Sequence, residues 1–367
     1  MKTTIKAPRQ WAPPHCPNHQ CAFHHSPNGW RFRRAGYYKR NTPPYHIQRY
    51  RCMHCRKSFS RQTFRNTYWL KRPDLLKKVF ELTVNGMANR QIARVLKCAP
   101  STVDNLIARI GRICVLYHLR LTKGASPPGD IVFDGLVSYE YSKYFRVEIL
   151  TAVDNDSSFI EFFALAQKRR SGQMTERQKE RRAELEAKYG RPDPRAVEKG
   201  TREVLEFCLQ GAQEVTLRTD EHTDYPLAMK GLNCAIEHRT TSSKDLRDRN
   251  NELFEINSLD RFLRHSSANH ARKTIAQSRR VQCIGERKVT FVVWKNCMKQ
   301  RWELGGPETP AMIKGLLDRP LRVQDILRER LFVDHYELPE GWHRLYWRLW
   351  ETPVLGTNRK HELKYAR

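Results

Sequence analysis

The sequence predicts a multidomain protein: a small N-terminal unit held together by a metal, an all-α unit, and an α/β domain with a helical C-terminal extension. Three observations predict this order. Four cysteines stand in two short loops within the first 55 residues, apolar residues then recur at helical spacing up to residue 122, and strand-like runs begin after residue 129. The 367 residues are enough for several cores, and we expect the units at 1–66, 67–122, 129–300 and 301–367.

The charge of the chain favours a polyanionic partner. Lys and Arg total 67 against 39 Asp and Glu, a formal net charge of +28, which is typical of proteins that bind nucleic acid. An anionic membrane surface would also attract this charge, but no run approaches the roughly 20 apolar residues of a membrane span. The start of the chain, Met1–Lys6, leads into Pro and His rather than an apolar signal core, so we expect no export and no membrane partner.

The N-terminal cysteines have the spacing of a zinc site. Cys16 and Cys21 form one short loop, Cys52 and Cys55 form another, and 30 residues separate the two loops. Two such loops complete a tetrahedral zinc site, and the segment between them is too poor in apolar residues to fold without the metal. We expect a zinc ribbon, either binding DNA or only stabilising the fold. A histidine can also replace one thiolate, and the candidates are His15, His19, His24, His25 and His54.

The second unit, 67–122, has the pattern of a helix-turn-helix. One helix begins near Asp74, a shorter one spans 89–96, and Ser101 with Asp104 is predicted to open a third helix as a capping box. At the start of the third helix, the side chains expected to face outward and reach DNA bases are Thr102, Asn105 and Arg109. The basic side chains expected to contact phosphates are Arg90, Arg94 and Lys97. A plain helical bundle joining two domains is the alternative.

A linker at 123–129 precedes the α/β domain. Its expected elements are strands at 131–137, 145–153 and 159–165, a helical, highly charged insertion within 168–210, strands at 215–219 and 234–238, and a long helix from about 253. Three antiparallel strands followed by alternating helices and strands is the order of a ribonuclease-H-like domain. The charged insertion is either a solvated helix face or a contact with flanking DNA or a second protomer.

Three carboxylates stand where this order would bring them together. Asp134 ends one apolar run, Asp220 ends another, and Glu255 follows in a helical stretch after 34 further residues. Two strand-end aspartates and a helical glutamate can hold two divalent cations for phosphodiester chemistry, and oxygen ligands favour Mg²⁺ or Mn²⁺. Other acidic residues compete for these roles, namely Asp130, Glu221, Glu252 and Glu286.

On these residues the chain resembles the DDE transposases of bacterial insertion sequences that carry an N-terminal zinc ribbon and helix-turn-helix. The resemblance covers about residues 16–300. It rests on the motifs 51–55, Phe133-Asp134-Gly135, Thr219-Asp220 and 255–259. Residues 271–275 and 278–279 also resemble the basic segment that follows the glutamate in this family.

The resemblance implies binding to terminal inverted repeats, followed by metal-dependent strand cleavage and strand transfer. Asp134, Asp220 and Glu255 would hold two Mg²⁺ ions, and the cysteines would hold structural Zn²⁺. The partners would be double-stranded transposon-end and target DNA and at least a second copy of the chain, in the nucleoid of the bacterial cytoplasm. Backbone phosphates would meet Arg272, Lys273, Arg279 and Arg280.

Two other functions fit the same residues. One is a DNA-binding regulator derived from a transposase, whose nuclease-like domain is inert; the other is a structure-selective nuclease without strand transfer. A nucleotide-driven motor is disfavoured because the sequence has no GxxxxGK[ST] loop. The aromatic and basic segment 342–350 either packs on the core or binds a partner.

Overall fold

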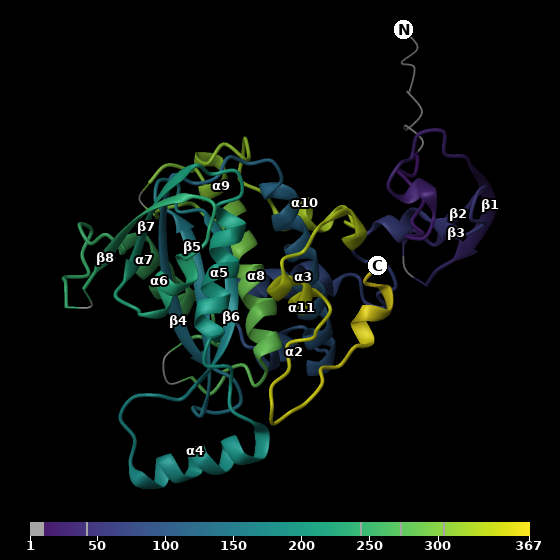
Figure 1. Ribbon diagram of the computed structural model, residues 1–367. Helices are drawn as coiled ribbons and strands as arrows, with labels where there is room; N and C mark the ends of the chain where they lie inside the picture. Colours follow the sequence, from purple (N-terminus) through teal and green to yellow (C-terminus); the bar gives the residue numbers. More distant parts are fainter. Residues whose placement is uncertain (1–10, 42, 243, 272–273, 304) are drawn as a thin grey trace.

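The computed structural model describes residues 11–41, 43–242, 244–271, 274–303 and 305–367. A small N-terminal sheet is followed by three helices and then by a five-stranded sheet with helices around it (Figure 1). The C-terminal segment returns to pack against both parts. In the described part of the chain, no helix combines the length and apolar character needed to cross a membrane.

The N-terminal unit is a three-stranded antiparallel sheet, with β1 (Phe32–Lys39), β2 (His46–Cys52) and β3 (Ser58–Ser60) in that order. The short 3-10 helices η1 (Ala22–His24) and η2 (Arg61–Phe64) flank it. Its core is made of aromatic rings, such as those of Phe59 and Phe64, packed beside three buried cysteines. Since such a core contains few aliphatic side chains, it depends on the cysteine cluster for cohesion.

Three helices follow: α1 (Leu75–Val84), α2 (Asn89–Val95) and α3 (Pro100–Thr122). The turn between α2 and α3 includes Lys97 at a positive φ of 48°. The predicted capping box is wrong. Pro100 is the first residue of α3 and Ala99 its N-cap, so Ser101 already lies inside the helix, and the Asp104 carboxylate instead accepts a hydrogen bond from the Asn89 amide at 2.6 Å.

The large sheet has the strand order β6-β5-β4-β7-β8. The strands β4 (Asp130–Tyr139), β5 (Phe145–Asp154) and β6 (Ile160–Arg169) form an antiparallel meander. The strands β7 (Glu214–Asp220) and β8 (Ala235–Thr241) run parallel to β4. This mixed order confirms the expected α/β core of ribonuclease-H-like type.

Helices cover both faces of this sheet. On one face α5 (Ala196–Cys208) lies so close that a Cβ on Gly200 would be 2.7 Å from the Leu150 side chain. On the other face α8 (Val281–Cys297) packs with Gly285 against Leu165. Successive strand residues point to opposite faces of a sheet, and directly paired residues point to the same face. Leu136 pairs with Ile149, which in turn pairs with Leu165. Asp134 is two residues from Leu136 and so points to the same face as Leu165. Asp134 therefore faces the α8 side.

The region predicted as a helical insertion has two different parts. The helix α4 (Glu176–Tyr189) contains no buried residue and extends away from the body (Figure 1). Its base is fixed by a bidentate ion pair between Arg169 and Glu186, with nitrogen–oxygen distances of 2.6 and 2.8 Å. By contrast, α5 buries an apolar face on the sheet. Only α4 is therefore peripheral to the core.

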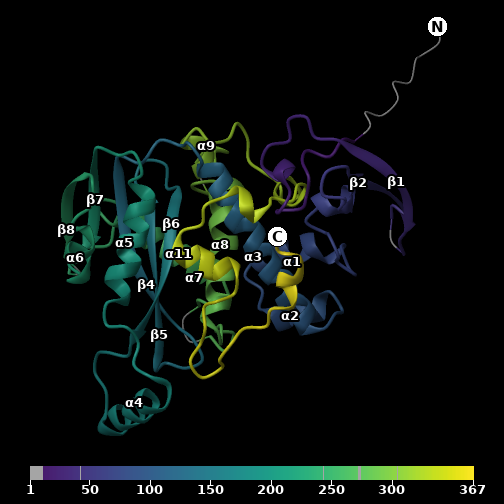
Figure 2. The same ribbon diagram turned by 45° about the vertical axis from the view of Figure 1, so that its right-hand side comes forward.

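The helix α8 is buried on nearly all sides because it lies between the sheet and α3 (Figure 2). The remaining helices are α6 (Asp224–Met229), α7 (Phe254–Ser266), α9 (Pro310–Ile313), α10 (Val323–Leu327), η3 (Val333–His335), α11 (Glu340–Tyr346) and η4 (His361–Tyr365). One apolar core runs from α1 through the sheet to α11. The C-terminal segment is thus part of the main body, and Trp342 is buried against Phe162 and Phe163.

Candidate metal centres

The four N-terminal cysteines form one cluster, as predicted. The sulfur atoms of Cys16, Cys21, Cys52 and Cys55 all lie within 4.8 Å of one another. Two come from the loop before η1 and two from the end of β2 and the turn after it. The cluster is consistent with zinc, since four thiolates at such distances are the ligands of a structural zinc site.

The surroundings of the cluster favour a thiolate at Cys52. Burial raises the pKa of this thiol, but hydrogen bonds from the Trp30 indole and from the backbone at Cys55 and His54 outweigh it, and the pKa falls to about 7. The indole nitrogen of Trp30 lies 3.2 Å from the Cys52 sulfur. Of the histidines considered as replacements, His54 is 3.6 Å from the Cys21 sulfur, whereas His15 and His24 belong to a separate group with His335.

The fold brings Asp134 and Asp220 to neighbouring positions on two adjacent parallel strands. β4 and β7 are paired with Asp130 opposite Thr216 and Val132 opposite Arg218. Two residues further along both strands, this register places Asp134 beside Asp220. Since residues two apart on a strand share a face, both carboxylates lie on the side covered by α8.

A third acidic residue joins this pair, and it is Asp260 on α7. Burial, together with the negative charges of Asp260 and Asp220, raises the pKa of Asp134 to about 7, and the Gly135 N–H, 2.6 Å from one Asp134 oxygen, opposes the rise. Burial likewise raises the pKa of Asp260 to about 6, against the opposing charges of Lys288 and Arg264. A buried carboxyl group whose pKa is raised by neighbouring negative charges is typical of acidic sites that take up cations.

The sequence reasoning missed Asp260, although the sequence does contain a signal for it. Ile256, Leu259 and Leu263 are the buried face of α7. Asp260 stands four residues after Ile256 and three before Leu263, so it lies on the same apolar stripe. An acidic residue on a buried stripe is costly unless it has a function or a partner.

The structure places Glu255 elsewhere. Its carboxylate accepts a hydrogen bond of 2.5 Å from the Ser158 hydroxyl and forms an ion pair of 3.2 Å with Arg301. Ser158 belongs to the hairpin between β5 and β6, where the Asn155 N–H donates to the Asp130 carbonyl. Asp130 and Asp134 are four strand residues apart, about 13 Å. Glu255 is therefore held near the start of β4, away from Asp134.

The competing acidic residues have other environments. Asp130 and Glu252 both pair with Arg218, at 2.8 and 3.2 Å. Glu286 is buried in an ion pair with Arg348 at 2.6 Å, and Glu221 is exposed. None of these four is among the main charges that act on Asp134.

The carboxylates around Asp134 are coupled through charge but are not in close contact. Among the described residues, the groups of three or more ligand atoms within 4.8 Å are the four cysteines and a trio of histidines. The donor set of Asp134, Asp220 and Asp260 nevertheless consists of carboxylate oxygens, the ligands that Mg²⁺ prefers.

The predicted DNA-contacting residues fall into three groups. Arg90, Arg94, Lys97 and Arg279 are exposed, and Thr102 and Asn105 are half-buried near the start of α3. Arg272 and Lys273 lie outside the described residues. The third group consists of Arg109 and Arg280, whose side chains are engaged within the protein.

The prediction that Arg109 faces outward is wrong. Its side chain is buried, donates to the carbonyls of Asn66 and Tyr68 at 3.2 and 2.6 Å, and pairs with Glu362 at 3.1 Å. Arg280 donates to the carbonyls of Leu355 and Gly356 at 3.0 and 2.8 Å. Both guanidinium groups fix the C-terminal segment, so neither is free for a phosphate in this structure.

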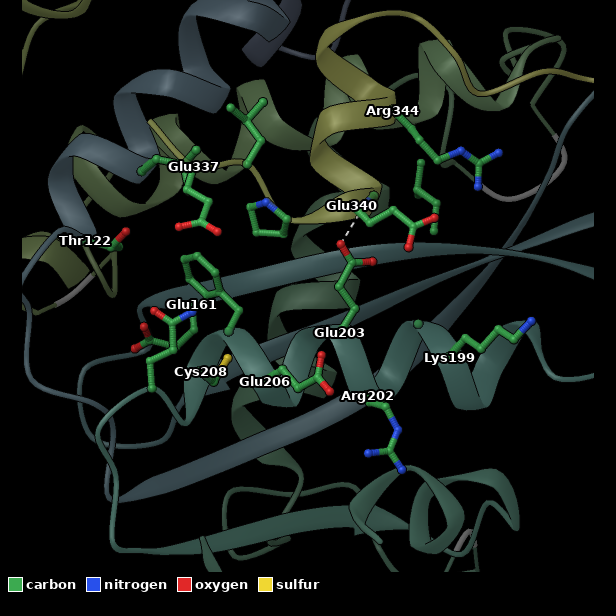
Figure 3. A pocket seen from close by; sticks show the side chains of 18 of the residues that line it. Thr122, Glu161, Lys199, Arg202, Glu203, Glu206, Cys208, Glu337, Glu340 and Arg344 are labelled. Carbon is green, nitrogen blue, oxygen red and sulfur yellow. Dashed lines mark hydrogen bonds between the residues drawn. The ribbon is translucent and has the colours of Figure 1, made fainter. Parts of the chain in front are cut away.

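A large cavity lies beside α5 at the β6 edge of the sheet. It encloses about 1210 Å³ between α5, the connection 122–128 and the segment 335–344 (Figure 3). Glu203 in its wall accepts a hydrogen bond from the Gly341 N–H at 2.6 Å, and Glu161 is paired with Lys314 at 2.5 Å. Asp134, Asp220 and Asp260 are not among its lining residues, so the cavity is separate from the carboxylate group.

Comparison with known proteins gives a limited result. Neither a family model nor a curated protein matches the chain. Among solved structures, the chain is similar to the HTLV-2 integrase catalytic core domain in complex with magnesium, with a TM-score of 0.21 and 11% identity over 52% of this chain and 97% of that one. It is also similar to the simian T-cell lymphotropic virus intasome in complex with the PP2A regulatory subunit B56 gamma, with a TM-score of 0.24 and 11% identity over 65% of this chain and 74% of that one. At such low scores neither likeness extends what the strand order shows: a mixed α/β core of ribonuclease-H-like type behind a four-cysteine cluster.

Proposed function

We propose that this protein is a DNA transposase that binds the ends of a mobile element and performs metal-dependent strand cleavage and strand transfer. One observation carries the proposal. Asp134 and Asp220 lie side by side on adjacent parallel strands, and the charge of Asp260 from α7 acts on Asp134. Three carboxylates from two strands and a helix are a suitable donor set for two Mg²⁺ or Mn²⁺ ions.

Each carboxylate has a defined task in this proposal. When bound, the two ions activate the attacking oxygen and stabilise the leaving oxygen of the phosphodiester. Asp134, Asp220 and Asp260 would hold these ions through their carboxylate oxygens. Metal binding requires Asp134 to release its proton, which links the activity to pH.

The basic surface of the chain supports DNA as the substrate. The formal net charge is +28, and the exposed side chains of Arg90, Arg94 and Lys97 lie on α2 and the turn before α3. Thr102 and Asn105 would then reach bases from the start of α3, as in a helix-turn-helix. Strand transfer needs two ends held together, so we also propose at least a dimer on DNA.

Strand cleavage and transfer on the flanking ends of the element, with Mg²⁺ or Mn²⁺, test the proposal. We expect the wild type to cut and join, while Asp220→Asn still binds the ends but loses cleavage by on the order of 10³-fold or more. Glu221→Gln is the matched control, because Glu221 is the next residue in the chain and is exposed.

Two outcomes would overturn the proposal. If wild type binds the ends and cuts with neither metal, the protein is a DNA-binding regulator with an inert nuclease-like domain. If it cuts without joining, it is a nuclease of the same fold. Equal activity of wild type and Asp220→Asn would remove Asp220 from the site.

A further inference from the structure

Three histidines from two distant parts of the chain meet beside the N-terminal sheet. His15 precedes the first cysteine, His24 ends η1, and His335 ends η3 in the C-terminal segment. Ligand nitrogens of all three lie within 4.8 Å of one another. The ring centroid of His335 is 4.8 Å from that of His15 and 4.5 Å from that of His24.

Hydrogen bonds orient two of these rings. The Nδ1 atoms of His15 and His24 lie 3.0 and 2.7 Å from the same backbone oxygen, that of Cys16. A carbonyl only accepts hydrogen bonds, so both Nδ1 atoms carry the hydrogen and each Nε2 keeps its lone pair when the ring is neutral. A histidine that ligates a metal usually donates its other N–H to a carbonyl or carboxylate in this way.

Three polar atoms at this point have no hydrogen-bond partner among the described residues. The Nε2 atoms of His24 and His335 and one oxygen of Asp334 are buried without a hydrogen bond. That Asp334 oxygen lies 4.0 Å from the Nε2 of His24, whose residue is only 1% exposed. Each buried polar atom without a partner costs about 1 to 3 kcal/mol, and one cation at the centre would satisfy all of them.

The rings are suited to a cation at neutral pH. Burial lowers the pKa of His24 and His335, the latter to about 4, with the neighbouring histidines adding to the effect. Both shifts favour the neutral ring, the form of histidine that coordinates a metal. Phe332 packs edge-on against His15 and His24, so the trio is shielded on one side by an apolar ring.

We propose that His15, His24, His335 and Asp334 form a second metal site, separate from the four cysteines, that takes a zinc-class divalent cation. Three imidazoles and one carboxylate can complete a tetrahedral zinc site, and imidazole ligands select zinc-class metals over Mg²⁺.

The site would act as a metal clamp between the ends of the chain. Two ligands belong to the N-terminal unit and two to the C-terminal segment, which lie side by side (Figure 2). The same segment already contacts this unit through Arg330, which donates to the carbonyl of Thr63 at 3.0 Å. A bound cation would add a further, stronger link and would fix the orientation of the N-terminal unit relative to the rest of the protein.

Metal content of the purified full-length protein tests the proposal. We expect two zinc ions per chain in the wild type and one in His335→Ala. The matched control is His46→Ala, because His46 is an exposed histidine of β2 in the same unit and its loss should leave two. The proposal is wrong if wild type binds one zinc ion per chain, or if His335→Ala still binds two.

Cobalt loading of the wild type gives a second measurement that does not depend on a variant folding. Thiolate ligands produce a sulfur-to-cobalt charge-transfer band, whereas histidine and carboxylate ligands do not. We expect two equivalents of Co²⁺ to bind, with the charge-transfer band saturating after one. In His335→Ala the band should be retained, which also shows that the ribbon is folded. Binding of only one equivalent would contradict the second site.

Discussion

The Asp134 carboxyl group is half-buried beside two other acids, Asp220 and Asp260. Burial and these like charges raise its pKa to about 7, from an ordinary value of 3.8. Without metal, the fold therefore keeps a proton on Asp134 that the unfolded chain has already released. A bound cation would favour the loss of this proton, because its positive charge would compensate the negative charges of all three acids.

This setting predicts a pH-dependent stability in Mg²⁺-free buffer. Between about pH 4 and pH 7 the folded state holds more protons at Asp134 than the unfolded state, so the free energy of unfolding falls as the pH rises. The fall attributable to Asp134 is at most about 4 kcal/mol, since one pKa unit corresponds to about 1.4 kcal/mol.

Urea unfolding across this pH range, with zinc retained, measures the effect. Asp134→Asn should flatten the pH dependence, and Glu221→Gln, at an exposed site, should not. An unchanged slope in Asp134→Asn would show that Asp134 has an ordinary pKa in the folded state.

The choice between Asp260 and Glu255 gives a second prediction at this scale. Asp260 acts on Asp134, whereas Glu255 is bound to Ser158 and Arg301. We expect Asp260→Asn to lose metal-dependent cleavage by on the order of 10² to 10³-fold, and Glu255→Gln to stay within several-fold of wild type. Both changes are isosteric, so each serves as the control for the other.

Single-turnover cleavage with DNA binding measured in parallel would decide between them. The opposite order of effects would show that Glu255 completes the site and that α7 must shift when metal binds. Sequence alone favoured Glu255 because it follows Asp220 in a helical stretch, but helical spacing does not say which turn of α7 reaches β4.

At the scale of elements, α3 has two different environments along its length. Its first turn carries Thr102 and Asn105, both half-buried, whereas Arg109 is buried against residues 66–68 and 362. Helical periodicity matches the burial of Val103, Leu106, Ile107 and Ile110. It wrongly placed Arg109 outside, because a long helix can be covered on a second side by a segment remote in sequence.

Two arginine variants separate the packing role of Arg109 from the proposed phosphate contact of Arg94 on α2. Arg109→Ala should destabilise the protein by roughly 2 to 3 kcal/mol, because it leaves two carbonyls without their donor and removes the closer of the two arginine partners of Glu362. Arg94→Ala should leave stability unchanged, since Arg94 is exposed, and should reduce the slope of log affinity against log salt by about 1.

Thermal unfolding and salt-dependent DNA binding of both variants provide the measurements. An identical salt slope for Arg94→Ala and wild type would remove Arg94 from the phosphate contacts. Full stability of Arg109→Ala would mean that its contacts contribute nothing to the fold.

The helix α4 contrasts with α5 at the same scale. Charge composition indicated a helix in this region, and α4 indeed buries none of its residues. The adjacent α5 has a buried face that includes Val197, Val204 and Leu205. The prediction of one charged insertion over 168–210 missed this difference, for which the apolar periodicity of α5 is the sequence signal.

At the scale of the whole molecule, the C-terminal segment completes the core. The ring of Trp342 stacks on Phe162 at 4.6 Å between centroids, and its indole N–H donates to the Phe163 carbonyl at 2.9 Å. Arg109, Arg280 and Arg330 all donate to groups of this segment or fix it against the N-terminal unit. The residues after 300 therefore stabilise the α/β domain.

Replacing Trp342 tests this dependence. Trp342→Ala should lower the free energy of unfolding by roughly 3 to 5 kcal/mol, because it removes a ring that is 1% exposed. Trp302→Ala is the control: that ring is 40% exposed, and its loss should cost less than about 1 kcal/mol. Equal effects in chemical denaturation would show that the segment does not contribute to the core.

The sequence by itself determined the features that depend on near neighbours in the chain. The spacing of Cys16, Cys21, Cys52 and Cys55 predicted their cluster, and the order of strand-like runs predicted the mixed sheet. The positions of Asp134 and Asp220 at corresponding points of two such runs also follow from local pattern. Each of these depends on strand periodicity or on the short reach of a loop.

Only the tertiary structure decided which remote groups meet. It made Asp260 rather than Glu255 a charge that acts on Asp134, buried Arg109 beneath the C-terminal segment, and brought His335 to His15 across the length of the chain. These contacts depend on the rotation and packing of whole elements against one another, and a local sequence pattern contains no information about the surface that a distant segment will cover.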